Sequence, residues 1–117
     1  MVAQDGSSVF TSTTITETTG EAEHEQIQEI EVIFGTFGRI GGNALDKCKN
    51  LQKLTMVNCN LEVISNLEPV GASLVHLCLS NQNITRMSGL SSLRQLRHLY
   101  LQQNRISRIE GLERFCD

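Results

Sequence analysis

A pattern of apolar residues occurs three times in this chain of 117 residues, with copies that start at Leu51, Leu74 and Leu96. Apolar residues lie three and five positions after each start, and then at every third position from the tenth onwards. In the last copy the pattern consists of Leu96, Leu99, Leu101, Asn104, Ile106, Ile109 and Leu112. A repeat this short cannot bury its own apolar side, so the copies must stack on one another. The spacing therefore predicts a solenoid that forms one small domain.

Each repeat contains two periods, and each period predicts a different element. Leu77 and Leu79 alternate with less apolar residues, which places both side chains on one face of a short, half-buried strand. Ile106, Ile109 and Leu112 recur at every third residue, which favours a 3₁₀ or helical return segment. The predicted fold class is α/β: a short solenoid with parallel strands on its concave side and 3₁₀ or helical returns.

One position of the repeat is polar and follows the strand. Asn104 occupies it in the last copy, where we expect its side chain to hydrogen-bond the loop backbone of neighbouring coils. Cys59 and Gln82 occupy the same position in the earlier copies. The ladder of polar side chains is therefore expected to be imperfect.

These motifs resemble a known family, the intracellular 22-residue class of leucine-rich repeats typified by the regulatory subunit of protein phosphatase 1. The phrase Arg-Ile-Glu-Gly-Leu at 108–112 is its most characteristic match. Residues 31–90 are more faintly similar to the N-terminal part of leucine-rich repeat-containing protein 9, through Leu67-Glu68-Pro69. The resemblance implies a scaffold that binds proteins on its concave face. Relatives serve phosphatase regulation, assembly of cilia and spliceosomal scaffolding, which implies a cytoplasmic protein or one of the cilium or flagellum.

The region before the repeats divides into two predicted parts. Residues 1–20 are rich in Ser, Thr and Gly, and we expect a disordered tail. Residues 21–38 are expected to form an amphipathic helix, because Ile27, Ile30, Phe34 and Phe37 recur at helical intervals and Thr18 and Glu21 have the spacing of a capping box. The predicted role of this helix is to cap the open apolar edge of the first coil, and docking into the groove of a partner is the alternative.

Residues 39–117 form the predicted repeat region. It opens with a degenerate half repeat, in which Leu45 and Cys48 precede Leu51 at the offsets that Leu90 and Leu93 hold relative to Leu96. The last repeat runs out at residues 114–117 without a polar closing helix. We therefore expect a truncated product, a short isoform or a mispredicted gene end, with self-association through the apolar edge around Ile109, Leu112 and Phe115.

Charge is distributed unevenly along the chain. Residues 1–38 contain seven acidic residues and no Lys or Arg, whereas residues 39–117 contain ten basic and six acidic residues. The basic residues are spread through the repeats rather than clustered, as expected of solvated coil surfaces. This distribution disfavours a nucleic-acid partner, although an RNA-associated scaffold of the spliceosomal type is the alternative function.

The four cysteines are Cys48, Cys59, Cys78 and Cys116, and none of them forms a Cys-x-x-Cys pair. We expect neither a secretory leader nor cysteine-rich end caps, and therefore reduced thiols in an intracellular compartment. The chain contains no apolar run long enough to cross a bilayer, so no membrane partner is expected.

The candidate site is the concave face, where the register predicts rows of outward side chains. Polar residues around Tyr100, the one aromatic anchor, suit a contact with a protein partner of unknown identity. The predicted protein-binding residues are Lys53, Thr55, His76, Cys78, Ser80, Asn81, His98, Tyr100 and Gln102. An inactive fragment of a longer leucine-rich repeat protein is the remaining alternative.

Catalysis and metal binding are disfavoured by the same residues. His76, Cys78 and His98 could approach one another on neighbouring strands, but no fourth zinc ligand is evident. A nucleophile pair of Cys78 with a histidine lacks a third group to orient the imidazole and a Gly-rich oxyanion loop. We therefore predict no enzyme activity, no catalytic or metal-binding residues and no cofactor.

Overall fold

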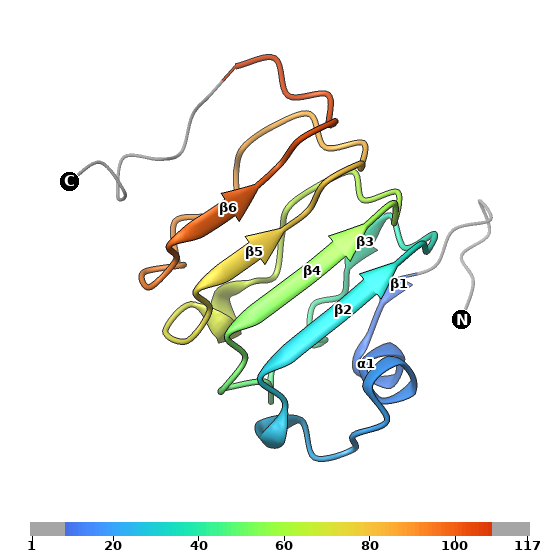
Figure 1. Ribbon diagram of the computed structural model, residues 1–117, viewed down its shortest axis with the longest axis vertical. Coiled ribbons are helices and arrows are strands. Elements are labelled where there is room, and N and C mark those ends of the chain that lie inside the picture. The colour runs from blue at the N-terminus through green and yellow to red at the C-terminus, as the bar shows by residue number, and fades with distance from the viewer. Residues whose placement is uncertain (1–8, 109–117) are drawn as a thin grey trace.

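The computed structural model describes residues 9–108, which form a stack of parallel strands with their return segments (Figure 1). Four strands make the main sheet, in the order β2-β4-β5-β6. A pair of short parallel strands, β1 and β3, lies apart from this sheet. The elements are β1 (Val9–Phe10), α1 (Ser12–Thr19), the 3₁₀ helix η1 (His24–Gln26), β2 (Glu29–Ile33), β3 (Arg39–Ile40), β4 (Lys53–Val57), the 3₁₀ helix η2 (Glu68–Val70), β5 (His76–Cys78) and β6 (His98–Tyr100).

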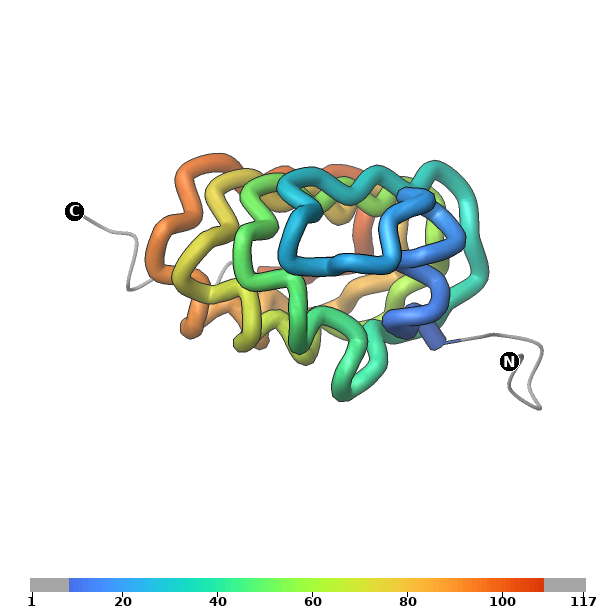
Figure 2. Tube along the Cα trace, turned by 90° about the horizontal axis from the view of Figure 1, so that it is seen from below, coloured from blue at the N-terminus to red at the C-terminus, as the bar shows by residue number. Residues whose placement is uncertain are grey.

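The predicted register of the repeats is confirmed. Leu54 pairs with Leu77, and Leu77 pairs with Leu99, on neighbouring parallel strands. Leu54 and Leu77 are fully buried, whereas Leu99 is half buried. Figure 2 shows the successive coils lying side by side along the stack. The chain is thus a repeat solenoid, as the spacing of its leucines predicts.

The prediction of a helix over residues 21–38 is wrong, because the strand β2 occupies the middle of that segment. Residues 29–33 alternate between exposed and buried, with Ile30 and Val32 buried. Together with Ile27, these residues repeat the offsets of Leu51, Leu54 and Met56, so the segment is a further coil of the solenoid. Pairing with β4 satisfies the backbone of the strand, and an amphipathic helix would lose that ladder.

The tail predicted over residues 1–20 is ordered from Val9 onwards, so the prediction is wrong for that part. Phe10 and Ile15 are fully buried, and β1 pairs with β3. The helix α1 begins after a capping box in which Thr11 and Thr14 bond each other's backbone N–H, and it ends at Gly20 in the left-handed region (φ 76°). The predicted box of Thr18 and Glu21 is absent from this helix.

The first coil is flanked by α1 rather than by a helix over residues 21–38. The helix contacts β2, the strand at the edge of the main sheet, and lies beside it in Figure 1. Phe10 packs edge-on against Phe37, with ring centroids 5.3 Å apart. These contacts give the apolar side chains of the first coil a covering layer that comes from residues 9–20.

The polar position of the repeat joins neighbouring coils, as predicted for Asn104. Its side chain donates to the carbonyls of Leu79 and Leu101 and accepts from the N–H of Ile84. Gln82 does the same one coil earlier, so the expected gap in the ladder does not occur there. Its Oε1 accepts from Cys59 and Leu61, and its Nε2 donates to the Met56 carbonyl at 2.6 Å.

The extra residue between Leu67 and Leu74 lies in the return segment, where η2 forms. Gly71 follows this turn and donates to the carbonyl of Glu68 while accepting from Arg94 of the next coil. A Cβ atom at position 71 would clash with the backbone of Ser92, so glycine is required by this close approach. The insertion thus leaves the strand register unchanged.

Candidate functional site

The outward side chains of β4, β5 and β6 form two complete rows across the main sheet. One row contains Lys53, His76 and His98, which are consecutive partners in the strand pairing. The second row contains Thr55, Cys78 and Tyr100. We call these six residues the central face. Both rows were predicted from the sequence, since a parallel pairing repeats the same offsets in every coil.

The other three predicted site residues lie where the strands end. The Ser80 hydroxyl donates to the Oε1 of Gln102 at 2.8 Å, and the N–H of Asn81 donates to the Gln102 carbonyl at 2.9 Å. Asn81 has a left-handed backbone (φ 59°) that starts the return turn. These polar groups bond one another, so they brace the rim of the central face.

Aromatic rings gather where β5 and β6 adjoin, on one side of the central face. The His76 ring lies 5.2 Å from the ring of Tyr100 and 5.6 Å from that of His98, measured between centroids. The planes are tilted by 39° and 42°. Tyr100 keeps 39% of its surface exposed. The cluster is thus an aromatic surface of mutually tilted rings that remains partly exposed to solvent.

The charges around this cluster disfavour the protonated form of His76. Partial burial lowers the pKa of His76, and the cationic groups of Lys53 and His98 lower it further. Glu29 opposes this shift from β2, which is separated from the strand of His76 by β4. The same carboxylate lies 3.8 Å from the Lys53 ammonium, at the long end of an ion pair between two half-exposed side chains.

The described cysteines are free thiols in two environments. Cys48 and Cys59 are fully buried, and burial raises the pKa of each to about 11. Cys78 is half buried and lies 3.5 Å from the Ser80 hydroxyl. Within residues 9–108, no three His, Cys, Asp or Glu side chains lie close enough together to hold a metal ion. This includes His76, Cys78 and His98. Cys116 lies outside the described residues.

Sequence reasoning missed the part of this face that β2 contributes. The pairing of β2 with β4 aligns Glu29 with Lys53 and Glu31 with Thr55, so both carboxylates face outwards beside the central face. Ile33 aligns with Val57 in the next row. The signal was present in Ile27, Ile30 and Val32, whose offsets of three and five match those of the later repeats.

A hollow that the sequence reasoning did not predict lies between α1 and the segment around residue 44. Its volume is about 480 Å³, and its lining includes Ser12, Thr16, Asn43 and Lys47. His24 also lines it, although the residue is only 7% exposed, and its Nε2 hydrogen-bonds the Thr16 hydroxyl at 2.9 Å. In the part of the chain that the structure describes, each buried polar side-chain atom has a partner. The hollow therefore contains no buried polar atom that awaits a ligand.

The helices of the described residues differ from a membrane-spanning helix in length or apolar character. No helix of residues 9–108 has the length and apolar character needed to span a bilayer. The apolar edge predicted around Ile109, Leu112 and Phe115 lies outside the described residues.

Comparison with known proteins identifies the repeats. Residues 72–114 match the model of a family described as leucine-rich repeats, in two copies. No curated protein matches the chain, so the resemblances to the phosphatase subunit and to leucine-rich repeat-containing protein 9 rest on motifs alone. Repeats of this family are typical protein–protein interaction modules and are generally not enzymes. The matched segment contains β5 and β6, so the comparison supports leucine-rich repeats in that part of the solenoid.

Proposed function

We propose that the chain is a non-enzymatic scaffold that binds a protein partner on the central face, with Tyr100 as the main contact residue. The observation that carries the proposal is the exposed aromatic cluster of Tyr100, His76 and His98 on consecutive strands. The sheet holds the backbone that bears these rings in one conformation, so little conformational entropy is lost when a partner covers them. Tyrosine is also among the residues that contribute most to protein interfaces.

The composition of the face supports a protein partner of mixed character. Lys53 and Thr55 place one cation and one hydroxyl beside the rings, and Ser80 and Gln102 supply a braced polar rim. A rim that excludes water around a buried aromatic anchor is the common arrangement of binding hot spots. The resemblance to the phosphatase-regulatory class supports a cytoplasmic setting, with phosphatase regulation, the cilium and splicing as the contexts to be compared.

The proposal is tested by capture of partners from the source cell with the full chain as bait. Tyr100→Ala should weaken capture of the main partner by about 1 kcal/mol or more, with smaller losses for His76→Ala and His98→Ala. Charge reversal at Arg86 and Arg108, on the return segments, is the control and should matter less. If the reversal abolishes capture and Tyr100→Ala leaves it intact, the partner binds the returns and the proposal is wrong.

The same capture distinguishes the RNA-associated alternative. A scaffold held by phosphate contacts is retained on RNA at low salt and released as the salt concentration rises, because counterions are exchanged. Capture that survives nuclease treatment and moderate salt supports a protein partner. Capture that disappears on nuclease treatment supports RNA.

A further inference from the structure

The outer face of β2 differs in chemistry from the central face beside it. Glu29, Glu31 and Ile33 point outwards from alternate positions of the strand, and all three are exposed. Phe34 follows directly and is 74% exposed, the most exposed of the large apolar side chains that the structure describes. We call these four residues the acidic–apolar strip. Two carboxylates and one large apolar group therefore lie on the edge strand of the sheet, and a second large apolar group follows it directly.

Phe34 adopts a backbone conformation that is unfavourable for phenylalanine. Its φ is +74°, and the equivalent turn positions of the later coils, Asn58, Asn81 and Gln103, have φ between 58° and 60°. Asparagine tolerates this left-handed region, whereas a bulky side chain costs about 1–2 kcal/mol there. An exposed ring recovers little of that cost through burial. The phenylalanine is thus better explained by a contact outside the chain than by the fold.

The charge around the strip is negative. Glu31 has no ion-pair partner among the described residues, and Glu29 has only the long contact with Lys53. Glu23 and Glu25 flank or lie in η1, immediately before the strand, and both are exposed. Residues 1–38 contain no Lys or Arg. A basic segment that approaches β2 therefore meets carboxylates with few competing cations.

We propose that the acidic–apolar strip binds an extended segment of a partner protein in which Lys or Arg residues and an apolar residue occupy alternate positions. Outward residues of a strand are about 6.6 Å apart, which is also the spacing of alternate side chains in an extended peptide. Such a segment can place its cations against Glu29 and Glu31 and its apolar side chain against Ile33 and the Phe34 ring. This inference rests on the proposed function, since it extends the binding face by one strand and names the partner's chemistry.

The experiment selects peptides from a random displayed library on the immobilised full chain, with prior depletion on the Phe34→Asn variant. Enriched peptides should carry Lys or Arg and an apolar residue at alternate positions. Affinity of a synthetic peptide from that set, measured by fluorescence anisotropy, should fall about tenfold in Phe34→Asn and about fivefold in Glu31→Gln. Val63→Ser is the matched control, because Val63 is 41% exposed on a return segment, and it should leave the affinity unchanged.

Stability separates the proposed contact from a structural role. Phe34→Asn removes the unfavourable left-handed phenylalanine, so its thermal midpoint should stay equal to that of the wild type or rise. If the variant is at least as stable but binds less peptide, the weaker binding comes from the missing ring and not from unfolding. The proposal is overturned if peptides of this composition are not enriched. It is also overturned if Phe34→Asn and Glu31→Gln both bind the peptide with the affinity of the wild type.

Tyr100→Ala distinguishes this inference from the proposed function. If that variant loses the peptide and Phe34→Asn keeps it, the strip is not the site and the central face is. If Phe34→Asn loses the peptide and Tyr100→Ala keeps it, the strip binds by itself, and the partner capture described above decides the central face separately. Loss in both variants supports one continuous site across β2, β4, β5 and β6.

Discussion

At the scale of single residues, Gln82 shows how one side chain joins adjacent coils. It is 5% exposed, and its amide accepts from the N–H groups of Cys59 and Leu61 at 3.0 and 3.1 Å while donating to Met56. The position usually contains asparagine, as at Asn104. Glutamine is longer by one methylene but still reaches all three backbone groups. Cys59, in contrast, makes only long thiol contacts with the carbonyls of Val32 and Val57.

Gln82→Met should therefore lower the free energy of unfolding by about 3 kcal/mol, because the thioether fills a similar volume but leaves two N–H groups and one carbonyl without their partner. Urea unfolding followed by circular dichroism measures the change. Ser80→Ala is the control, because it removes one exposed hydrogen bond and should cost less than about 1 kcal/mol. Equal losses in the two variants would show that water replaces the buried amide.

At the scale of elements, β4, β5 and β6 could be predicted because their leucines repeat at the same offsets. The strand β2 could not, since Ile27, Ile30, Phe34 and Phe37 fit helical intervals as well as Ile27, Ile30 and Val32 fit the repeat. A short apolar pattern does not separate the two periods by itself. The pairing with β4, which settles the choice, joins residues such as Ile30 and Leu54 that are far apart along the chain.

The residues of the candidate site were predicted where their strands were predicted, on β4, β5 and β6, and were missed on β2. Central-face rows such as Thr55, Cys78 and Tyr100 follow directly from the repeat offsets. Glu29 and Glu31 were missed as neighbours of these rows because a helix would have placed them elsewhere. The aromatic cluster around His76 also depends on ring orientations, which the offsets do not specify.

The N-terminal elements were missed because their burial depends on distant residues. Phe10 and Ile15 are isolated apolar residues in a segment rich in Ser and Thr, so no periodicity marks them. Both become fully buried because β1 pairs with β3 and α1 contacts β2. This is a tertiary effect that local propensity does not contain.

Ile15→Ala tests whether α1 stabilises the fold. Since the side chain is fully buried, truncation should lower the free energy of unfolding by about 2–5 kcal/mol. Ile33→Ala is the matched control, because Ile33 is 48% exposed and its truncation removes little buried surface. Chemical denaturation of both variants measures the difference. Equal stability of Ile15→Ala and the wild type would restore the view of residues 1–20 as a tail without a structural role.

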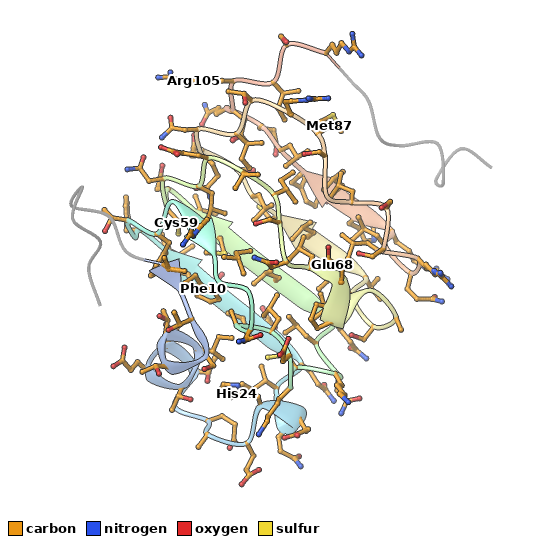
Figure 3. All side chains as sticks on the ribbon, turned by 180° about the vertical axis from the view of Figure 1, so that it is seen from behind. Phe10, His24, Cys59, Glu68, Met87 and Arg105 are labelled. Atoms are coloured by element: carbon orange, nitrogen blue, oxygen red, sulfur yellow. The ribbon has the colours of Figure 1, made fainter. Side chains whose placement is uncertain are left out.

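At the scale of the whole molecule, charge varies along the stack of coils. Acidic residues accumulate before and within β2, whereas Arg94, Arg97 and Arg105 belong to the coils around β6. Figure 3 places His24, which lies between two of the acidic residues, and Arg105 at opposite ends of the molecule. The two kinds of charge thus lie towards opposite ends of the stack, and the aromatic cluster of β5 and β6 lies near the basic end. Such a separation of charge along a molecule favours one orientation of a partner whose own charge is uneven.

The stability of the whole fold should depend on pH through His76, which lies on β5 between Lys53 of β4 and His98 of β6. Burial, then Lys53 of β4 and His98 of β6, lower its pKa below the usual 6.5, with Glu29 of β2 opposing them. The unfolded chain thus binds the proton more readily than the folded chain. The contribution of the neutral ring is complete above pH 6.5, and it is lost as the pH falls through 6.5 towards the lower pKa of the folded state.

His76→Gln removes this titration and isolates its effect. The free energy of unfolding of the wild type, measured by urea denaturation at several pH values between about 8 and 5, should decline relative to that of the variant as the pH falls below 6.5. In His98→Gln one of the two opposing cationic groups is absent, so the relative decline should be smaller. A wild type that gains stability over His76→Gln at acidic pH would show that Glu29 dominates and that the pKa of His76 is raised instead.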